Sequence, residues 1–137
     1  MEQQARTAES SPGLARLAVV QGAFDVVTGV WPILHLRSFE AVTGPKPEGW
    51  LVKTVGALIT AIGGTLLSAG LRRRVAPEVA ALAVGSAVAL ATVDVIYATR
   101  RRISPVYLLD AVAETALVAC WGVLLARERG GKAATAG

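Results

Sequence analysis

The sequence has few aromatic residues, one cysteine and one histidine. The single cysteine and the single histidine each exclude a class of site. Aromatic residues make up only 5% of the 137 residues. With Cys120 alone, the chain can form neither an internal disulfide nor a cysteine-based metal centre. With His35 alone, a haem-binding histidine pair and a His-x-x-x-His zinc motif are absent. A Gly-rich phosphate loop and a Ser-His-Asp constellation are missing too, so we expect no cofactor and no metal.

Apolar residues are abundant instead. They amount to 53% of the chain, with a mean hydropathy of +0.52, which exceeds what a soluble domain of this size needs to fill a core. The first apolar stretch is longer than a signal-peptide core and has no small-x-small cleavage site. We therefore interpret it as a retained membrane span after an N-terminal tail, residues 1–13.

Basic residues outnumber acidic residues by 14 to 10, giving a net charge of +4. They lie in short runs between the apolar stretches rather than along one helix face. This arrangement is typical of membrane flanks, where cations meet lipid phosphates, and it argues against nucleic-acid binding.

Four segments reach the roughly 20 apolar residues that cross a bilayer. The predicted fold is all-α, an integral membrane bundle of four up-and-down transmembrane helices within residues 14–126. The spans are about 14–36, 50–71, 77–99 and 105–126. Short connections make successive helices antiparallel, whereas the longer connection 37–49 is expected to fold back on the mouth of the bundle. Residues 127–137 form a C-terminal tail, and we expect its small, polar stretch 130–137 to be disordered.

Orientation follows from the charges that flank the spans. The side with both termini holds eight cations, namely Arg6, Arg16, Arg72, Arg73, Arg74, Arg127, Arg129 and Lys132. The opposite side holds six, namely Arg37, Lys46, Lys53, Arg100, Arg101 and Arg102. The positive-inside rule favours cytoplasmic termini. The small size and the Ala and Arg richness of the chain indicate a cell (inner) membrane.

Acidic residues inside the spans are the main functional signal. A mid-membrane Asp costs about 2.5 to 3.5 kcal/mol, so such residues normally face the protein interior and mark a functional path. Helical spacing places the acids on three polar stripes that should all turn inward. The stripes comprise Gln21, Asp25, Thr28, Pro32 and His35 in the first span, Ser86, Leu90, Asp94 and Tyr97 in the third, and Tyr107, Asp110, Glu114 and Trp121 in the fourth.

The same spacing predicts how deep these groups lie. His35, Lys53, Asp94, Tyr97, Tyr107 and Asp110 fall near the face of the 37–49 connection, and Asp25 and Glu114 fall near the midplane. The polar groups thus form a funnel that opens beside this connection and reaches half way across. The other half of the bundle is expected to be apolar and closed.

Asp110 and Glu114 stand four residues apart on one helix face. Two carboxylates about 6 Å apart in a poor dielectric cannot both ionise cheaply, so a shared proton or a bound cation is expected there. Lys53 is the nearest internal cation, although it is equally able to reach the membrane interface. For His35 an interfacial or hydrogen-bonded role is favoured over metal binding, and interface anchoring is the default role of Trp31, Trp50 and Trp121.

The second span carries small residues every four positions: Gly56, Thr60, Gly64 and Ser68. Such a stripe lets another helix approach closely, and packing within the chain is favoured over a homo-oligomer interface.

Three functions fit these features. The first is a pocket that binds a small lipophilic or amphipathic ligand, with Glu114, Asp110 and Asp25 as candidate general acid/base groups. Its ligand-contacting residues would be Gln21, Thr28, Trp31, His35, Lys53, Asp94, Tyr97, Tyr107 and Trp121. The second is an oligomeric proton- or cation-coupled transporter. The third is a structural or assembly subunit in which partners neutralise the carboxylates.

The order of the motifs also resembles a known group of membrane proteins. The polar first helix QGAFDVVTGVWP, a longer first connection, the Gly-rich VGALITAIGGTLL and two hairpinned helices with inward acids look like DoxX-like and EXPERA-like four-helix proteins. The resemblance covers about residues 14–126 and is carried by Gly29, Pro32 and the region of Gly63. It implies a left-handed four-helix bundle and, on the EXPERA side, a membrane pocket with paired acids for sterol-like ligands.

Overall fold

The computed structural model describes residues 9–137, and this part of the chain contains helices but no strand. The elements are α2 (Pro12–Leu34), α3 (Leu36–Thr43), α4 (Gly49–Leu71), α5 (Pro77–Thr99) and α6 (Tyr107–Thr135). All but α3 are long and apolar enough to cross a membrane, which makes four candidate spans. The predicted all-helical class with four such helices is confirmed.

The end of α6 differs from the prediction. Residues 130–137 were expected to be disordered, but the helix continues through Gly130 and Gly131 to Thr135. Extending an existing helix adds one hydrogen bond per residue without a new nucleus, and Arg, Lys and Ala after residue 126 are good helix formers. This propensity outweighs the cost of two glycines.

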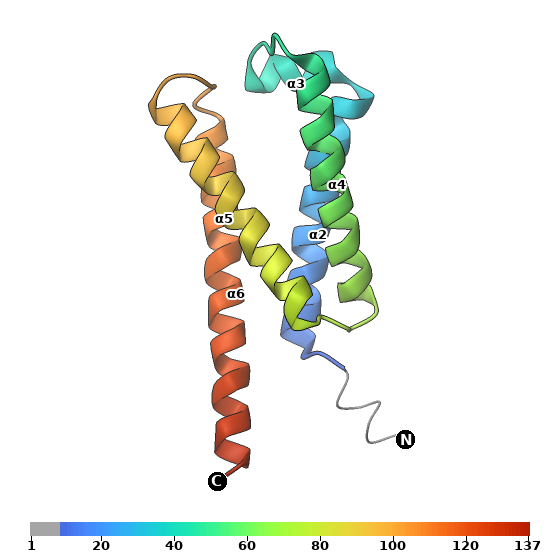
Figure 1. Ribbon diagram of the computed structural model, residues 1–137, viewed down its shortest axis with the longest axis vertical. Coiled ribbons are helices and arrows are strands. Elements are labelled where there is room, and N and C mark those ends of the chain that lie inside the picture. Colours follow the sequence, from blue (N-terminus) through green and yellow to red (C-terminus); the bar gives the residue numbers. More distant parts are fainter. Residues whose placement is uncertain (1–8) are drawn as a thin grey trace.

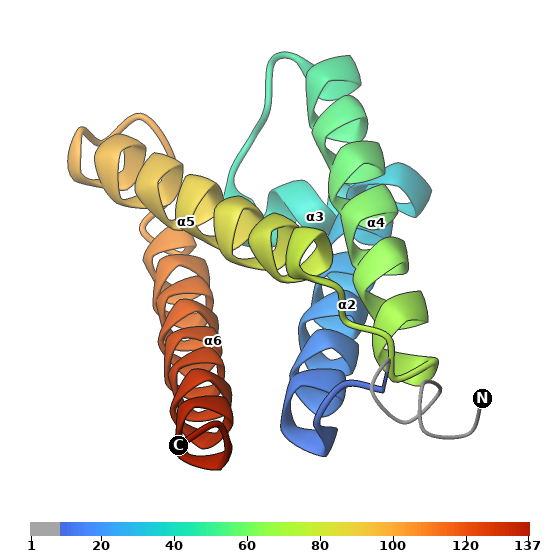
Figure 2. The ribbon, with the colours of Figure 1, turned by 60° about the horizontal axis from the view of Figure 1, so that its bottom comes forward.

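The long helices form two antiparallel pairs, α2 with α4 and α5 with α6 (Figure 1). The pairs meet at the end where α2 and α5 begin and part toward the end that carries α3. Although only residues 72–76 join α4 to α5, these two helices diverge rather than pack along their length. An extended segment leads from α3 back to the start of α4 (Figure 2).

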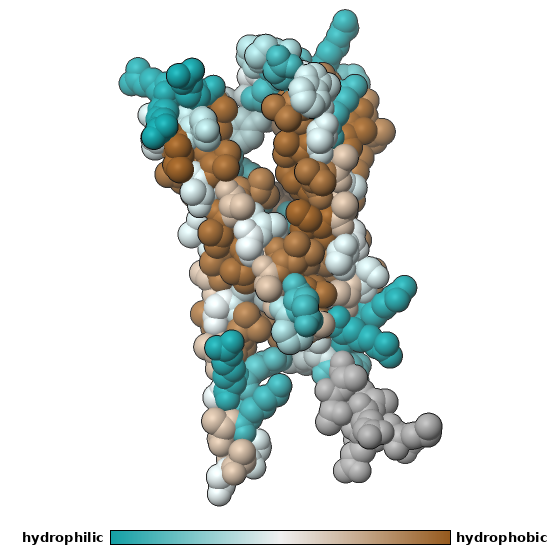
Figure 3. Space-filling view, in the orientation of Figure 1, coloured by the Kyte–Doolittle hydropathy of each residue, from teal (hydrophilic) through white to brown (hydrophobic). Residues whose placement is uncertain are grey.

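Hydrophobic residues cover the middle of the visible surface, and hydrophilic residues gather at its two ends (Figure 3). Many of the exposed side chains on the long helices are large and apolar, such as Val27 (67% exposed), Leu58 (61%) and Val112 (69%). An apolar belt between polar ends matches the cross-section of a bilayer.

Helices α2 and α4 approach so closely that only glycine fits at their contact. A Cβ on Gly22 would lie 2.6 Å from the carbonyl oxygen of Gly63, and one on Gly29 would lie 2.6 Å from that of Gly56. A Cβ on Gly70 would meet the carbonyl oxygen of Ala15 at 2.7 Å. These glycines recur every seven residues in each helix, so they stay on one face along the whole contact.

The predicted small-residue stripe of α4 is therefore only half right. Gly56 and Thr60 pack against Gly29 of α2, within the chain. Gly64 has no atom near its Cβ position and Ser68 is exposed, because an α-helix turns 3.6 residues per turn and a four-residue repeat drifts off the contact. Gly63 and Gly70 take their place.

The two arginine triplets end helices in the same way. Arg73 and Arg101 have positive φ angles of 52° and 55°. The amide of Arg74 donates to the carbonyl of Ala69 at 2.9 Å, and that of Arg102 donates to the carbonyl of Tyr97 at 2.9 Å. Both are Schellman motifs, which normally place glycine where the middle arginine stands. Three exposed cations are thereby presented at each turn.

The core lies at the end where the two pairs meet. Its buried residues come from all four long helices: Leu14, Ala18, Leu66, Ala80, Ala83 and Trp121. Ser10 joins the segment before α2 to the connection before α5, since its hydroxyl accepts from the amide of Val75 at 2.7 Å. The core at this end is apolar, as predicted, but the end is not closed, because a pocket lies beside the core.

Gly63→Ala should destabilise the protein by about 1 to 3 kcal/mol, the usual range for overpacking. The added Cβ would lie 2.6 Å from the Cβ of Asp25 and 2.8 Å from the backbone of Gly22 and Val26. Gly64→Ala is the matched control, since its Cβ meets open space. Chemical unfolding in detergent micelles measures both. Equal stability of the two variants would contradict the close α2–α4 contact.

Candidate functional site

The four carboxyl groups inside the predicted spans come from three helices. Asp25 lies on α2, Asp94 on α5, and Asp110 and Glu114 on α6. Asp25, Asp94 and Glu114 are 2%, 5% and 1% exposed, and Asp110 is half-buried. The structure thus turns all four inward, and we call them the acid cluster.

The members of the acid cluster lie near one another. The carboxyl of Asp94 on α5 and that of Asp110 on α6 are direct neighbours. Asp25, Asp94 and Asp110 are all close enough to Glu114 for their charges to repel it. Residues distant in sequence therefore form one electrostatically coupled group between α2, α5 and α6.

No cation neutralises the acid cluster within residues 9–137. The one ion pair of that range joins Arg73 to Glu9 at 3.8 Å, at the surface. Buried oxygens of Asp25 (Oδ1), Asp94 (Oδ2) and Glu114 (Oε2) have no hydrogen-bond partner. Such atoms are rare in proteins because each costs about 1 to 3 kcal/mol or more. Within the described residues, no hydrogen-bond donor reaches these three oxygens.

Lys53 does not fill this need. It stands one turn inside α4, but its side chain is exposed and forms no ion pair with Asp94 or Asp110. The alternative in which it pairs with them is therefore wrong. The exposed side chain lies near the start of α4, a helix that packs against α2 and not along α5.

A buried glutamine forms the floor of the cluster. Gln21, one turn from Asp25, accepts a 2.7 Å hydrogen bond from Nε1 of Trp121 and donates a 2.9 Å bond to the carbonyl of Ala83. These two bonds link α2 to α6 and α5. Trp121, for which an interface role was the default interpretation, is instead fully buried. Below this floor lies the apolar core.

The predicted mouth of the cluster is at the end with α3, where Lys46 contacts the start of α6. Nζ of Lys46 lies 4.8 Å from the ring centre of half-buried Tyr107, and it also donates to the carbonyl of Thr43 at 3.1 Å. The amide of Lys46 donates to Glu40 at 3.0 Å. The connection between α2 and α4 thus contacts the start of α6, three residues before Asp110. Sequence reasoning missed Lys46, and the turn-forming prolines on either side of it were the available signal.

Residues predicted on the outer part of the stripes hold the α2–α3 joint instead. Nδ1 of His35 accepts from the amide of Ser38 at 3.2 Å, and Nε1 of Trp31 donates to the hydroxyl of Ser38 at 2.8 Å. The hydroxyl of half-buried Thr28 donates to the carbonyl of Phe24 at 2.9 Å. Tyr97 is 46% exposed, so its predicted inward position is wrong. The stripe of α5 leaves the interior where α5 diverges from α2 and α4.

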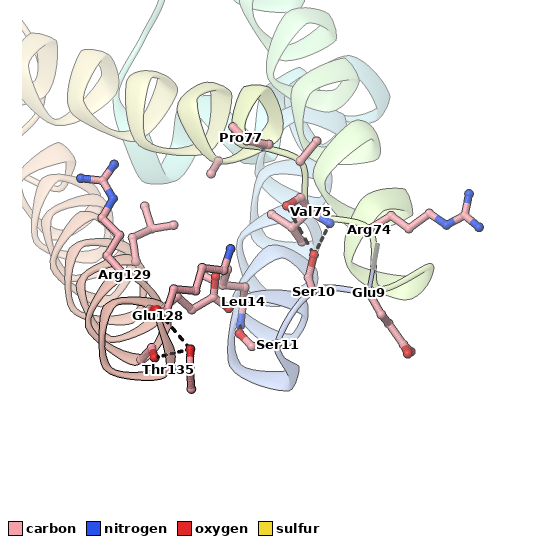
Figure 4. Close-up of a pocket in the computed structure, with 15 residues that line it drawn as sticks. Glu9, Ser10, Ser11, Leu14, Arg74, Val75, Pro77, Glu128, Arg129 and Thr135 are labelled. Carbon is pink, nitrogen blue, oxygen red and sulfur yellow. Dashed lines mark hydrogen bonds between the residues drawn. The ribbon is translucent and has the colours of Figure 1, made fainter. Parts of the chain in front are cut away.

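A separate pocket of about 940 Å³ lies at the opposite end of the molecule (Figure 4). Its lining comes from the start of α2, the α4–α5 connection and the C-terminal part of α6. The predicted funnel has its acid groups at the other end, so this pocket does not belong to it.

No protein-family model, curated protein or solved structure is significantly similar to this chain. The resemblance to DoxX-like and EXPERA-like proteins stays a prediction from the sequence.

Gln21→Met should destabilise the fold by about 1 to 3 kcal/mol, because it leaves the buried indole N–H of Trp121 without an acceptor. In Gln21→Met/Trp121→Phe both partners are gone, so the double variant should cost less than the sum of the single changes. Unfolding free energies of the two single variants and the double variant measure this coupling. Strict additivity would show that the Gln21–Trp121 bond does not join α2 to α6.

Proposed function

We propose that this chain is a multi-pass membrane protein whose acid cluster binds the polar end of a small lipophilic or amphipathic ligand. The observation that carries the proposal is a group of buried carboxyls with unpartnered oxygens and no cation. An amine or hydroxyl would supply the missing donors, and hydrocarbon would lie along the apolar helices.

The membrane part of the proposal rests on the four long apolar helices and the apolar surface between polar ends. The flanking charges favour cytoplasmic termini, and the small size and the Ala and Arg richness of the chain favour a cell (inner) membrane. In that orientation the 72–74 triplet lies on the cytoplasmic side and the 100–102 triplet on the other side.

Access from the α3 end agrees with the arrangement of the helices. The two pairs part toward that end, and Asp110, the outermost acid of α6, is only half-buried. Toward the other end, the Gln21–Trp121 floor and the apolar core lie below the acid cluster. A ligand would reach Asp94 and Asp110 first and Asp25 and Glu114 deeper in.

General acid/base catalysis on the ligand is a finer version of the same proposal. In this version the neighbouring carboxyls of Asp94 and Asp110 share a proton, and Glu114 with Asp25 lies next to them. A carboxyl kept protonated in such a site can act as a general acid. Glu114, Asp110 and Asp25 are the residues that would carry the chemistry.

A proton- or cation-coupled transporter is the second candidate, and the neighbouring carboxyls of Asp94 and Asp110 inside the spans favour it. Four helices are few for transport, so this function requires an oligomer. Gly56 and Thr60 are occupied by α2, which leaves Gly64 and Ser68 on the exposed face of α4 for such an interface. The structural alternative is disfavoured, since it needs partners on the carboxylates.

The test uses three ten-carbon probes: decylamine, decanol and decanoate. In lipid nanodiscs, decylamine or decanol should raise the unfolding temperature of the wild-type protein, and Glu114→Gln and Asp25→Asn should lose most of that increase. Decanoate, which adds a negative charge, should not stabilise the protein. At a ligand concentration of 100 times Kd the stabilisation amounts to about 2.7 kcal/mol.

Glu78→Gln is the matched control, because Glu78 is an exposed acid in the first turn of α5, outside the acid cluster. An equal temperature increase in Glu114→Gln would show that the probes bind elsewhere. If no probe binds, yet wild-type liposomes acidify across a pH gradient and Glu114→Gln liposomes do not, the transporter function replaces the ligand site.

A further inference from the structure

We propose that the pocket at the end with both termini binds an anionic phospholipid of the surrounding bilayer. This site is separate from the acid cluster and rests only on the membrane part of the proposed function. We call it the lipid groove. Its occupant is a two-chain lipid with a negatively charged headgroup.

The lipid groove combines polar and apolar walls. Ser10 and Ser11 line it near the start of α2, and Leu14, Ala80 and Leu125 line it on the side of the core. Leu14 and Ala80 belong to the buried core, and Leu125 packs against it. The apolar wall thus continues from the hydrocarbon level of the helices, while the polar wall lies at their ends. A phospholipid has the same division between chains and headgroup.

The charges around the groove favour an anion. Arg74, Arg129 and Lys132 line it together with Glu9 and Glu128. Glu9 is paired with Arg73 at 3.8 Å, which leaves three lining cations against Glu128. In Figure 4, Arg129 of α6 and Arg74 of the α4–α5 connection stand on opposite sides of the groove, and their long side chains extend outward from it. Each cation near a charged membrane surface contributes roughly 1 kcal/mol of attraction, a fivefold change in binding.

The length of α6 explains why a groove exists. Its 29 residues, at about 1.5 Å each, exceed the roughly 30 Å of hydrocarbon that a span must cross. The last turns of α6 extend beyond the start of α2 (Figure 1) and form one wall, with Gly131, Lys132 and Thr135 on the groove side. The pocket of about 940 Å³ is far larger than a phosphate ion and suits part of a lipid.

Gly131 provides a steric test. It lines the groove, whereas its neighbour Gly130 does not, and neither has an atom within 4 Å of its Cβ position. Gly131→Phe should fill the groove and Gly130→Phe should not, although both place the same side chain in the same helix. Protein purified with equal palmitoyl-oleoyl phosphatidylglycerol and phosphatidylcholine is analysed by native mass spectrometry. Wild type and Gly130→Phe should retain phosphatidylglycerol preferentially, and Gly131→Phe should lose the preference.

Charge variants test the headgroup contact. Arg129→Gln/Lys132→Gln should lower retention of phosphatidylglycerol over phosphatidylcholine by about fivefold per cation removed. Arg100→Gln/Arg102→Gln, at the opposite end, should retain the wild-type ratio. Equal losses in both double variants would mean a general surface attraction and would overturn the groove. Retained preference in Gly131→Phe would overturn it as well.

Two further outcomes separate this inference from the proposed function. Displacement of phosphatidylglycerol by soluble glycerol 3-phosphate would show a site for phosphate esters rather than for a lipid, and would overturn the inference alone. A protein that stays soluble and monomeric after detergent removal, without entering vesicles, would overturn the membrane assignment together with the lipid groove.

Discussion

The close contact of α2 with α4 is the constraint on which the other features depend. Glycines spaced by seven residues bring the two backbones together, so that a Cβ at Gly63 would collide with Asp25. Helix α4 therefore covers one face of α2 completely. The polar side chains of α2, Gln21 and Asp25, are left to the side of α5 and α6. There Gln21 bonds both helices, and Asp25 meets the remaining acids.

Burying four carboxyl groups in the interior costs folding free energy. Four ionised carboxyls in a poor dielectric repel one another, and their desolvation adds several kcal/mol for each charge. Packing in the apolar core and the hydrogen bonds of Gln21 compensate part of this cost. The remaining cost falls when the carboxyls gain protons, a cation or a donor group from a ligand. Site and fold are thus coupled, because the glycine contact that stabilises the α2–α4 pair also holds Asp25 in the interior.

Residue spacing was enough to predict the four apolar helices and the inward direction of Asp25, Asp94, Asp110 and Glu114. Residue spacing failed where the direction of a side chain depends on how the helices pack against one another. Tyr97 follows the periodicity of Asp94, yet the divergence of α5 exposes it. Lys53 is near the acids in depth, yet its side chain is exposed and forms no ion pair with them, and depth along an axis contains no information about rotation around the bundle. Similarly, a four-residue repeat suggested Gly64 and Ser68, whereas the seven-residue repeat of Gly56, Gly63 and Gly70 makes the contact between α2 and α4.

The groove beside α6 exists because α6 continues to Thr135. The small, polar composition of residues 130–137 predicted a disordered tail and therefore concealed this extension.

An experimental structure in a lipid bilayer, at a resolution that separates side chains from bound molecules, tests the central claim most directly. The account predicts Asp25, Asp94, Asp110 and Glu114 around one site, with non-protein density at the oxygens that lack partners and Lys53 outside. A dry core, in which Lys53 or backbone amides satisfy every carboxylate, would contradict it and leave the acids with a purely structural role.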